Sequence, residues 1–163
     1  MSNPNIFSVE ALKEIVKEQR KENKIIVFTN GCFDIIHAGH VSSLTFAKKQ
    51  GDILIVAVND DTSVRRLKGE TRPILSLDKR VDVLYALKPV DFITTFSQDN
   101  AVDVIKILQP DVYVKSEEYD IFNIPEGIEV LKYGGKVISS PQLPGVSTTA
   151  IIKKICSIGG LEK

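Results

Sequence analysis

The chain has 163 residues, 43% of them hydrophobic, and 21 lysines and arginines balance 21 aspartates and glutamates. This length and hydrophobic content predict one domain with a single core, spanning residues 1–163. The balanced charge excludes a broadly basic nucleic-acid binder, so any anion site must be local. Cys32 and Cys156 lack CxxC spacing, which argues against a zinc ribbon or a disulfide framework and favours the cytoplasm. The N-terminal stretch has no uninterrupted apolar run like a signal peptide or membrane span, so we expect a soluble protein without membrane contact.

Strands and helices are predicted to alternate along the chain. The strands are short apolar runs, and the helices carry apolar residues on one face between capping residues and glycine or proline stops. The expected helices are Ser8 to about Arg20 (an accessory helix within 1–23), 40–51, Leu77 to about Leu87, a helix capped by Asp99 or Asn100 and stopped at Pro110, 126–135, and 147–158. The expected strands are 24–31, 52–60, 91–96, 111–116 and 136–140, and residues 60–73 are expected to form a polar loop.

Continuously apolar strands joined through helices indicate a parallel sheet that is buried on both faces. Right-handed crossovers then give an α/β, Rossmann-like fold, which is a doubly wound parallel sheet in a three-layer αβα arrangement. Ligands of such sheets bind beyond the carboxyl ends of the strands, near the topological switch point. The turn after the first apolar strand is expected to lie there.

The stretch TNGCFDIIHAGH, residues 29–40, occupies that turn and contains both histidines of the chain, His37 and His40. Gly39 leaves room for a phosphate at the start of the following helix, and the turn itself offers backbone N–H groups. Two histidines at this spacing can also simply fill a turn. A zinc site would need further ligands, and none stands at ligand spacing nearby. The position after the strand favours the phosphate interpretation.

A second anion site is predicted where Pro144 and Gly145 lead into Ser147, Thr148 and Thr149 at the start of a helix. A capping box would place Glu or Gln three residues after the cap, where this chain has alanine. The first-turn amides therefore remain available to a ligand. An ordinary N-cap is the alternative interpretation.

These motifs carry a resemblance to a known family. HxGH at His37 to His40, the preceding small-Phe-Asp turn and the late Ser-Thr-Thr helix start resemble the cytidylyltransferase-type nucleotidyltransferase superfamily. Across most of the chain, blocks such as FTNGCFDIIHAGHVSSL, IVAVNDDTSVRRLKGETRPI, LQPDVYVK and STTAIIKKI are most similar to the adenylyltransferase of ADP-heptose synthesis. The resemblance implies transfer of AMP from ATP to a heptose 1-phosphate, with release of pyrophosphate. It also implies Mg²⁺ carried as Mg-ATP rather than by tight protein ligands, and a homodimer.

Charge crowding is the chemical obstacle in such a transfer, because a sugar phosphate is already a nucleophile and needs no strong base. Donors aimed at the nucleotide phosphates would therefore do most of the catalysis. The predicted catalytic residues are His37, His40, Lys49 and Lys68. The predicted nucleotide-binding residues are Thr29, Asn30, Gly31, Cys32, Phe33, Gly39, Asn59, Lys115, Ser147, Thr148 and Thr149, and the predicted substrate-binding residues are Asp34, Arg72 and Arg80.

Some of these residues have a second interpretation. Lys68 can belong to a basic surface loop, Arg80 can be a solvated helix residue, and Asp34 can cap the turn instead of orienting Mg²⁺ or substrate hydroxyls.

The chain departs from the heptose enzymes after its fourth predicted strand. They typically have Lys-Gly-Gly-Asp-Tyr, whereas this chain has lysine, Ser116, Glu117, glutamate and tyrosine. Side chains thus stand where bare backbone can lie against a ligand, which bears on the choice of acceptor. A glycerol-3-phosphate cytidylyltransferase is one alternative, but an arginine common in its Ser-Thr-Thr region is missing between Gln142 and Ser147. The other is a non-catalytic nucleotide-binding module, which the intact HxGH and Ser-Thr-Thr runs disfavour.

Overall fold

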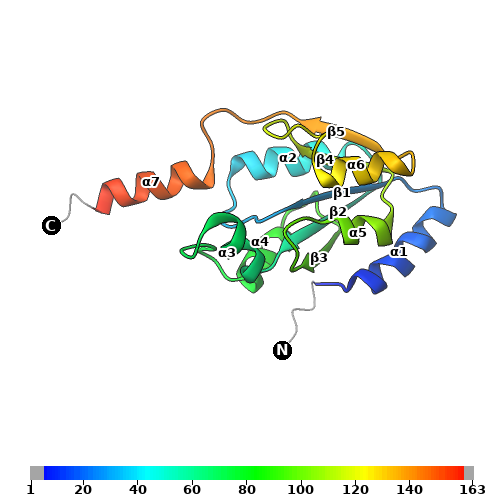
Figure 1. Cartoon of the computed structure of the whole chain (residues 1–163), viewed down its shortest axis with the longest axis horizontal. Coiled ribbons are helices and arrows are strands. Elements are labelled where there is room, and N and C mark those ends of the chain that lie inside the picture. Colours follow the sequence, from blue (N-terminus) through cyan, green and yellow to red (C-terminus); the bar gives the residue numbers. More distant parts are fainter. Residues whose placement is uncertain (1–5, 160–163) are drawn as a thin grey trace.

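A computed structural model describes residues 6–159, so the ends of the expected domain, 1–5 and 160–163, lie outside the described residues. A five-stranded parallel sheet with strand order β3-β2-β1-β4-β5 forms the centre of the molecule (Figure 1). The strands are β1 (Ile26–Gly31), β2 (Ile53–Asn59), β3 (Phe92–Phe96), β4 (Val112–Ser116) and β5 (Lys136–Ser140). The helices are α1 (Val9–Lys21), α2 (Ala38–Lys48), α3 (Asp61–Lys68), α4 (Leu77–Tyr85), α5 (Val102–Leu108), α6 (Pro125–Lys132) and α7 (Thr148–Gly159).

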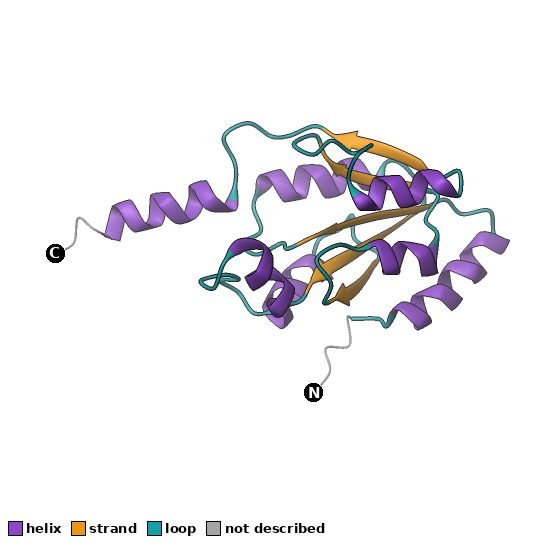
Figure 2. Cartoon of the chain, in the orientation of Figure 1, coloured by secondary structure: helices purple, strands orange, loops and turns teal. Residues whose placement is uncertain are grey.

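The sheet is buried on both faces because successive apolar side chains of each strand point to opposite sides. On one face Phe28 of β1 packs in a cluster with residues of α1, α5 and α6. On the other face Val27 packs in a separate cluster with residues of α2 and α4. Figure 2 shows the helices lying on both sides of the strands. The predicted three-layer, doubly wound α/β fold is therefore confirmed.

The expected N-terminal helix forms with its predicted cap. The Ser8 hydroxyl accepts a hydrogen bond from the backbone N–H of Ala11 at 3.1 Å, which satisfies one of the free donors of the first turn. Leu12 and Val16 face inward and are buried in the cluster that contains α5. This helix is thus part of the core of the domain.

The prediction of a polar loop over 60–73 is wrong for its first part, which forms α3. The Asp60 carboxylate caps this helix by accepting from Ser63 N at 2.7 Å, and Val64 is fully buried against the sheet. Only two of the eight residues of α3 are apolar, so the apolar periodicity that indicates a helix is weak in this segment.

The prediction that Asp99 or Asn100 is the N-cap of α5 is also wrong, because Ala101 occupies that position. Asn100 Oδ1 still accepts from Val102 N at 3.2 Å, whereas Asp99 forms an ion pair with Arg66 of α3 at 2.8 Å. Helix α4 ends at Tyr85, two residues before the expected Leu87, which is within the usual variation of helix ends.

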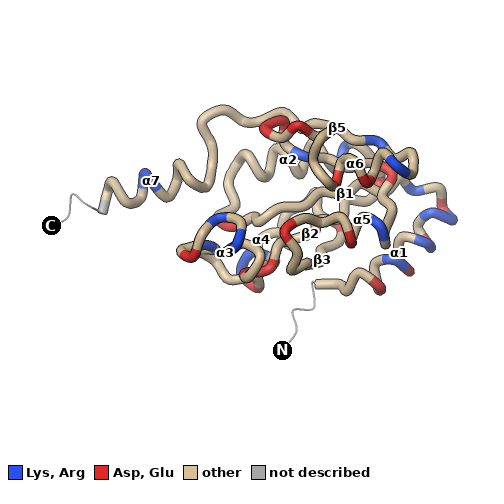
Figure 3. The backbone as a smooth tube through the Cα atoms, viewed as in Figure 1, with Lys and Arg blue, Asp and Glu red and all other residues tan. Residues whose placement is uncertain are grey.

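The order of the strands places the topological switch between β1 and β4, whose connections leave on opposite faces of the sheet. After β5, the chain crosses back to the start of α2 before α7 projects from the body of the domain (Figure 1). Basic and acidic residues are interspersed along the chain in Figure 3. Within residues 6–159, no helix has the length and apolar character that crossing a membrane requires.

Candidate active site

The carboxyl ends of the strands open into a cleft of about 690 Å³ at the switch point, a size typical of small-molecule sites. It is formed by the loop after β1, the starts of α2 and α7, the end of α3 and the segment after β4. Sixteen of the predicted site residues line it, namely Thr29, Asn30, Gly31, Cys32, Phe33, Asp34, His37, Gly39, His40, Asn59, Lys68, Arg72, Lys115, Ser147, Thr148 and Thr149.

The two histidines lie face to face at the start of α2. Their ring centroids are 3.8 Å apart with 27° between the planes, and Phe33 packs against His40 with centroids 5.4 Å apart. Gly39 makes this arrangement possible, because a Cβ at that position would stand 3.0 Å from the ring of His37. His37 is the N-cap residue of α2 but its side chain caps no amide, so the first-turn N–H groups have no side-chain cap.

Both imidazoles have an unsatisfied nitrogen. Nδ1 of His37 and Nδ1 of His40 are buried and lack a hydrogen-bond partner among the described residues. Burial lowers the pKa of His37, and burial together with the charge of His37 lowers the pKa of His40 to about 4. Both rings are therefore neutral near pH 7 in the free protein, and each still carries one N–H donor. Buried nitrogens without partners at a helix start are suited to an anionic ligand.

The start of α7 meets the same loop. Thr148 Oγ1 donates to the carbonyl of Ile35 at 3.4 Å, which joins two segments 113 residues apart in the chain. Ser147 acts as an N-cap, since its hydroxyl accepts from Ala150 N at 3.1 Å. The first turn of α7 contains no acidic residue. The cap interpretation is thus correct for one amide, while the helix start still faces the cleft.

Asp34 holds the loop between α3 and α4 over the site. Its carboxylate, 2% exposed as a residue, accepts from Arg72 Nε at 2.6 Å and from the backbone N–H groups of Ile74 and Leu75 at 2.8 and 2.9 Å. Burial opposes the charge, but these hydrogen bonds and the guanidinium outweigh it and lower the pKa of Asp34. Its oxygens are therefore occupied by the 72–75 loop, so Asp34 holds that loop instead of capping its own turn.

Two predicted site residues lie away from the cleft. Lys49 is exposed at the C-cap of α2, at the opposite end of the helix from His40. Arg80 is fully buried and donates to the carbonyls of Cys32 and Leu75 and to Asp61 Oδ1 at 2.8 Å. Arg80 thus holds the loop after β1 from inside the protein. Its position fits neither of the two interpretations, as a substrate ligand or as a solvated residue.

Lys68 and Asn59 occupy the side of the cleft next to α3. Lys68 is the last residue of that helix and is exposed, whereas Asn59 is buried with its Nδ2 donating to Ser63 Oγ at 3.0 Å.

Burial raises the pKa of the Cys32 thiol, and the surrounding cations only partly oppose this. Cys32 is therefore a neutral thiol near pH 7, suited to packing and weak hydrogen bonding.

A buried polar network forms the floor of the cleft between β1 and β4, and sequence reasoning missed its central acid, Glu126. Asn30 Nδ2 donates to Glu126 Oε1 at 3.1 Å, and Asn30 Oδ1 accepts from Tyr113 at 2.8 Å. Lys115 Nζ donates to the Asn30 carbonyl at 2.9 Å. No local pattern marks Glu126, because an acid in the first turn of a helix is common on protein surfaces.

Glu117, in the segment that departs from the heptose enzymes, is not among the residues that line the cleft. Its carboxylate accepts from the backbone N–H of Gln142 at 2.9 Å and so ties the end of β4 to the linker before α7. Ser116, Glu118 and Tyr119 of the same segment do line the cleft.

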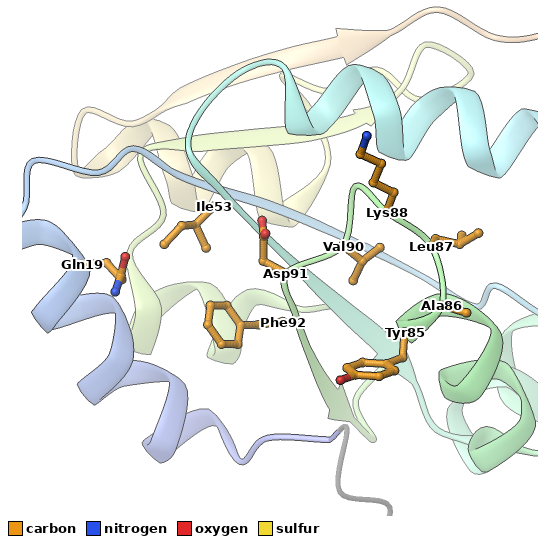
Figure 4. Close-up of a pocket in the computed structure, with 9 residues that line it drawn as sticks. All are labelled: Gln19, Ile53, Tyr85, Ala86, Leu87, Lys88, Val90, Asp91 and Phe92. Atoms are coloured by element: carbon orange, nitrogen blue, oxygen red, sulfur yellow. The ribbon is translucent and has the colours of Figure 1, made fainter.

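A second hollow, of about 490 Å³, lies at the amino ends of β2 and β3 (Figure 4). Asp91, its central acid, already accepts from Leu54 N at 2.7 Å and pairs with Lys48. This hollow lies at the amino ends of the strands, whereas the histidines lie at the carboxyl ends.

No group of three or more His, Cys, Asp or Glu residues within 6–159 is arranged to hold a metal ion.

The protein is thus a Rossmann-like α/β protein, and the class binds its ligands at the switch point, where this chain has the histidine pair at a helix start. Residues 28–154 match the family model described as Cytidylyltransferase-like, and the chain belongs to this family. It is accordingly a nucleotidyltransferase.

Curated relatives cover nearly the whole chain. It is 47% identical over 154 residues to the bifunctional protein HldE of Coxiella burnetii, which is 94% of this chain and 32% of that protein. It is 48% identical over 156 residues to the HldE protein of Shewanella amazonensis, which is 96% of this chain and 33% of that protein. The chain thus spans about a third of the length of the curated relatives it matches.

Two solved structures are similar to the fold. A lipopolysaccharide core biosynthesis protein from Thermoplasma volcanium has a TM-score of 0.59 at 28% identity, covering 74% of this chain and 97% of that one. Pantoate-beta-alanine ligase from Francisella tularensis, complexed with beta-gamma ATP and beta-alanine, has a TM-score of 0.64 at 15% identity, covering 91% of this chain and 73% of that one. At that identity the second comparison shows the fold alone.

Proposed function

We propose that the protein transfers AMP from ATP to a sugar phosphate, D-glycero-D-manno-heptose 1-phosphate, forming ADP-heptose and pyrophosphate. The observation that carries this proposal is the meeting, in one cleft, of two features suited to binding phosphate. The stacked pair of His37 and His40, with its unpartnered nitrogens, lies at the start of α2, and Thr148 ties the start of α7 to the same loop. The family match and the HldE relatives support the reaction type.

The chemistry follows from the groups that surround the cleft. A phosphate oxygen of the acceptor attacks the α-phosphorus of ATP, and the bond from that phosphorus to the bridging oxygen breaks to release pyrophosphate. His37 and His40 would donate to the α-phosphate and bridging oxygens as negative charge grows on them, and the amides of α7 would receive the terminal phosphates. Lys68 and Lys115 supply positive charge on the other sides of the cleft. No side chain has to remove a proton from the acceptor.

Mg²⁺ fits this site as a counterion of the nucleotide. Asp34 lines the cleft, but its oxygens are occupied by Arg72, Ile74 and Leu75, so the phosphates themselves would be the principal ligands. When bound, the ion would neutralise the departing pyrophosphate. We further propose that the protein is a homodimer, as the resemblance implies, and that it is cytoplasmic, as its two cysteines without CxxC spacing suggest. Sedimentation velocity measures the oligomeric state directly.

The acceptor and the base are tested together by measuring pyrophosphate release. ATP, CTP, GTP and UTP are each combined with heptose 1-phosphate, glycerol 3-phosphate, choline phosphate and flavin mononucleotide. We expect release only with ATP and heptose 1-phosphate. Release with CTP and glycerol 3-phosphate would support a glycerol-3-phosphate cytidylyltransferase instead. No release with any pair, despite nucleotide binding, would indicate that this chain by itself does not catalyse transfer.

A further inference from the structure

Glu126 is a buried carboxylate in the wall of the cleft. It stands near the start of α6 and is 6% exposed, and its Oε1 accepts from Asn30 Nδ2 at 3.1 Å and from Ala101 N at 3.2 Å. Neither donor is charged. A neutral glutamine could accept the same two hydrogen bonds, whereas burying a charge is costly unless something compensates for it. The negative charge of Glu126 therefore needs a reason beyond the local hydrogen bonds.

Asn30 connects this carboxylate to a cation. Because a carboxylate only accepts, Asn30 must turn its NH₂ group toward Glu126 and its Oδ1 the other way. That oxygen then accepts from Tyr113 at 2.8 Å and from Lys115 Nζ at 3.3 Å, and the Asn30 carbonyl accepts from the same Nζ at 2.9 Å. The network thus has a buried negative end and a positive end that lines the cleft.

Lys115 retains capacity for a ligand. An ammonium group has three N–H donors, and the two oxygens of Asn30 take two of them. The described residues supply no third acceptor, and the ring of Tyr119 lies 5.1 Å from Nζ. The remaining donor is available to a bound anion in the cleft.

We propose that Glu126 is a positioning residue, which acts through Asn30 to hold Lys115 charged and oriented toward a substrate phosphate. This inference rests on the proposed function for the identity of the ligand, but the link between Glu126 and Lys115 is a property of the free protein. Nothing in the sequence pattern of the Lys115 segment indicates it, since the two residues lie on different elements.

The charges around Lys115 agree with this role. Burial lowers the pKa of Lys115, and Glu126 makes the largest opposing contribution, followed by Cys32 and by Glu118 on the loop after β4. Lys68 at the end of α3 lowers this pKa further. Loss of the charge of Glu126 should therefore leave more Lys115 in the neutral form at alkaline pH.

The first test needs no substrate. Competitive acetylation with acetic anhydride over a range of alkaline pH, followed by peptide mass spectrometry, reports the titration of individual lysines. In Glu126→Gln, we expect the midpoint for Lys115 to move to lower pH, while that of Lys17 on the exposed face of α1 stays unchanged. Glu129→Gln, which neutralises another carboxylate of α6 outside the cleft, is the matched control and should leave Lys115 unchanged.

Rescue by a conservative variant separates this role from simple support of the fold. Glu126→Asp keeps the charge, so it should keep the Lys115 midpoint close to that of the natural protein even if its hydrogen bonds lengthen. An unchanged Lys115 midpoint in Glu126→Gln would overturn the proposal. Failure of both variants to fold would also overturn it, because the carboxylate would then be a structural requirement.

Kinetics provide the second test. At about pH 9, kcat/KM of Glu126→Gln should fall about tenfold, the equivalent of one weakened charge-assisted hydrogen bond, with a smaller loss near neutrality. The alkaline limb of the pH profile should move in parallel with the acetylation midpoint. If the protein transfers no nucleotide to any acceptor, the proposed function fails while the acetylation result still decides the role of Glu126. A pH profile that does not change in an active Glu126→Gln enzyme would refute the catalytic part of the proposal.

Discussion

Acid should destabilise this protein through His40, and the effect can be isolated by replacing that one side chain. The pKa of His40 is about 4 in the folded protein, against 6.5 for an unperturbed histidine. Between these values the unfolded chain binds more protons than the folded chain, so stability falls as the pH falls. Asp34 does not contribute in this window. Its pKa is lowered in the folded protein, so stability is lost only when the pH falls below 3.8, the ordinary pKa of an aspartate, where the unfolded chain takes up the proton first.

The size of the effect follows from the two pKa values. At about pH 5, His40 is almost fully protonated in the unfolded chain and only about a tenth protonated in the folded protein. Integrating from about pH 7.5 to about pH 5 gives a loss of about 2 kcal/mol in the free energy of unfolding. His37 adds a loss of the same sign, since burial also lowers its pKa.

Urea denaturation at both pH values measures this loss. His40→Gln removes the titrating group, so the pH dependence should decrease by about 2 kcal/mol relative to the natural protein. Lys49→Gln changes a charge at the other end of α2 and should leave the pH dependence unchanged. Pyrophosphate should reduce the acid sensitivity of the natural protein, because a bound anion favours the protonated rings. Identical pH dependence in the natural protein and His40→Gln would refute the assignment of a buried neutral imidazole.

The other predictions concern turnover, binding and selectivity. His37→Ala should reduce kcat on the order of 100-fold or more with little change in ATP affinity, as measured by initial rates and calorimetry; near-normal kcat would remove it from the transition state. Thr148→Glu should weaken ATP binding while the Tm without ligand holds or rises, because a first-turn carboxylate stabilises a helix by about 0.3 to 1 kcal/mol yet repels phosphates. Replacing Ser116 and Glu117 by glycine should change acceptor or nucleotide preference in the pyrophosphate assay, and kinetic constants that stay the same for every pair would make this segment irrelevant to selectivity.

The parts of the site that sequence reasoning located are those that depend on neighbouring residues. His37, Gly39 and His40 follow the first buried strand directly, and a strand, turn and helix start are encoded within a dozen residues. The position of such a turn in a parallel sheet is a general property of the fold. The cleft that contains these residues was therefore predictable from local sequence patterns.

Residues whose roles depend on distant partners were less predictable. Arg80 was expected at the substrate, but Asp61 and the carbonyl of Cys32 hold it inside the protein. Lys49 follows the right helix, although at the wrong end of it. The pattern of residue types along the sequence predicts a helix and its apolar face, but it does not predict which long polar side chains form hydrogen bonds with buried partners.

The sequence alone determined the fold class, the order of most elements and the position of the turn proposed to bind phosphate, because hydrophobic periodicity, caps and glycines act over a few residues. Only the tertiary structure decided which polar groups share a partner. Glu126 and Asn30 are 96 residues apart, and Thr148 and Ile35 are 113 apart, yet each pair is in contact. Such contacts form because burial of the two apolar faces of the sheet brings strands and helices together. The spacing of two residues along the chain does not indicate how far apart they lie in the folded protein.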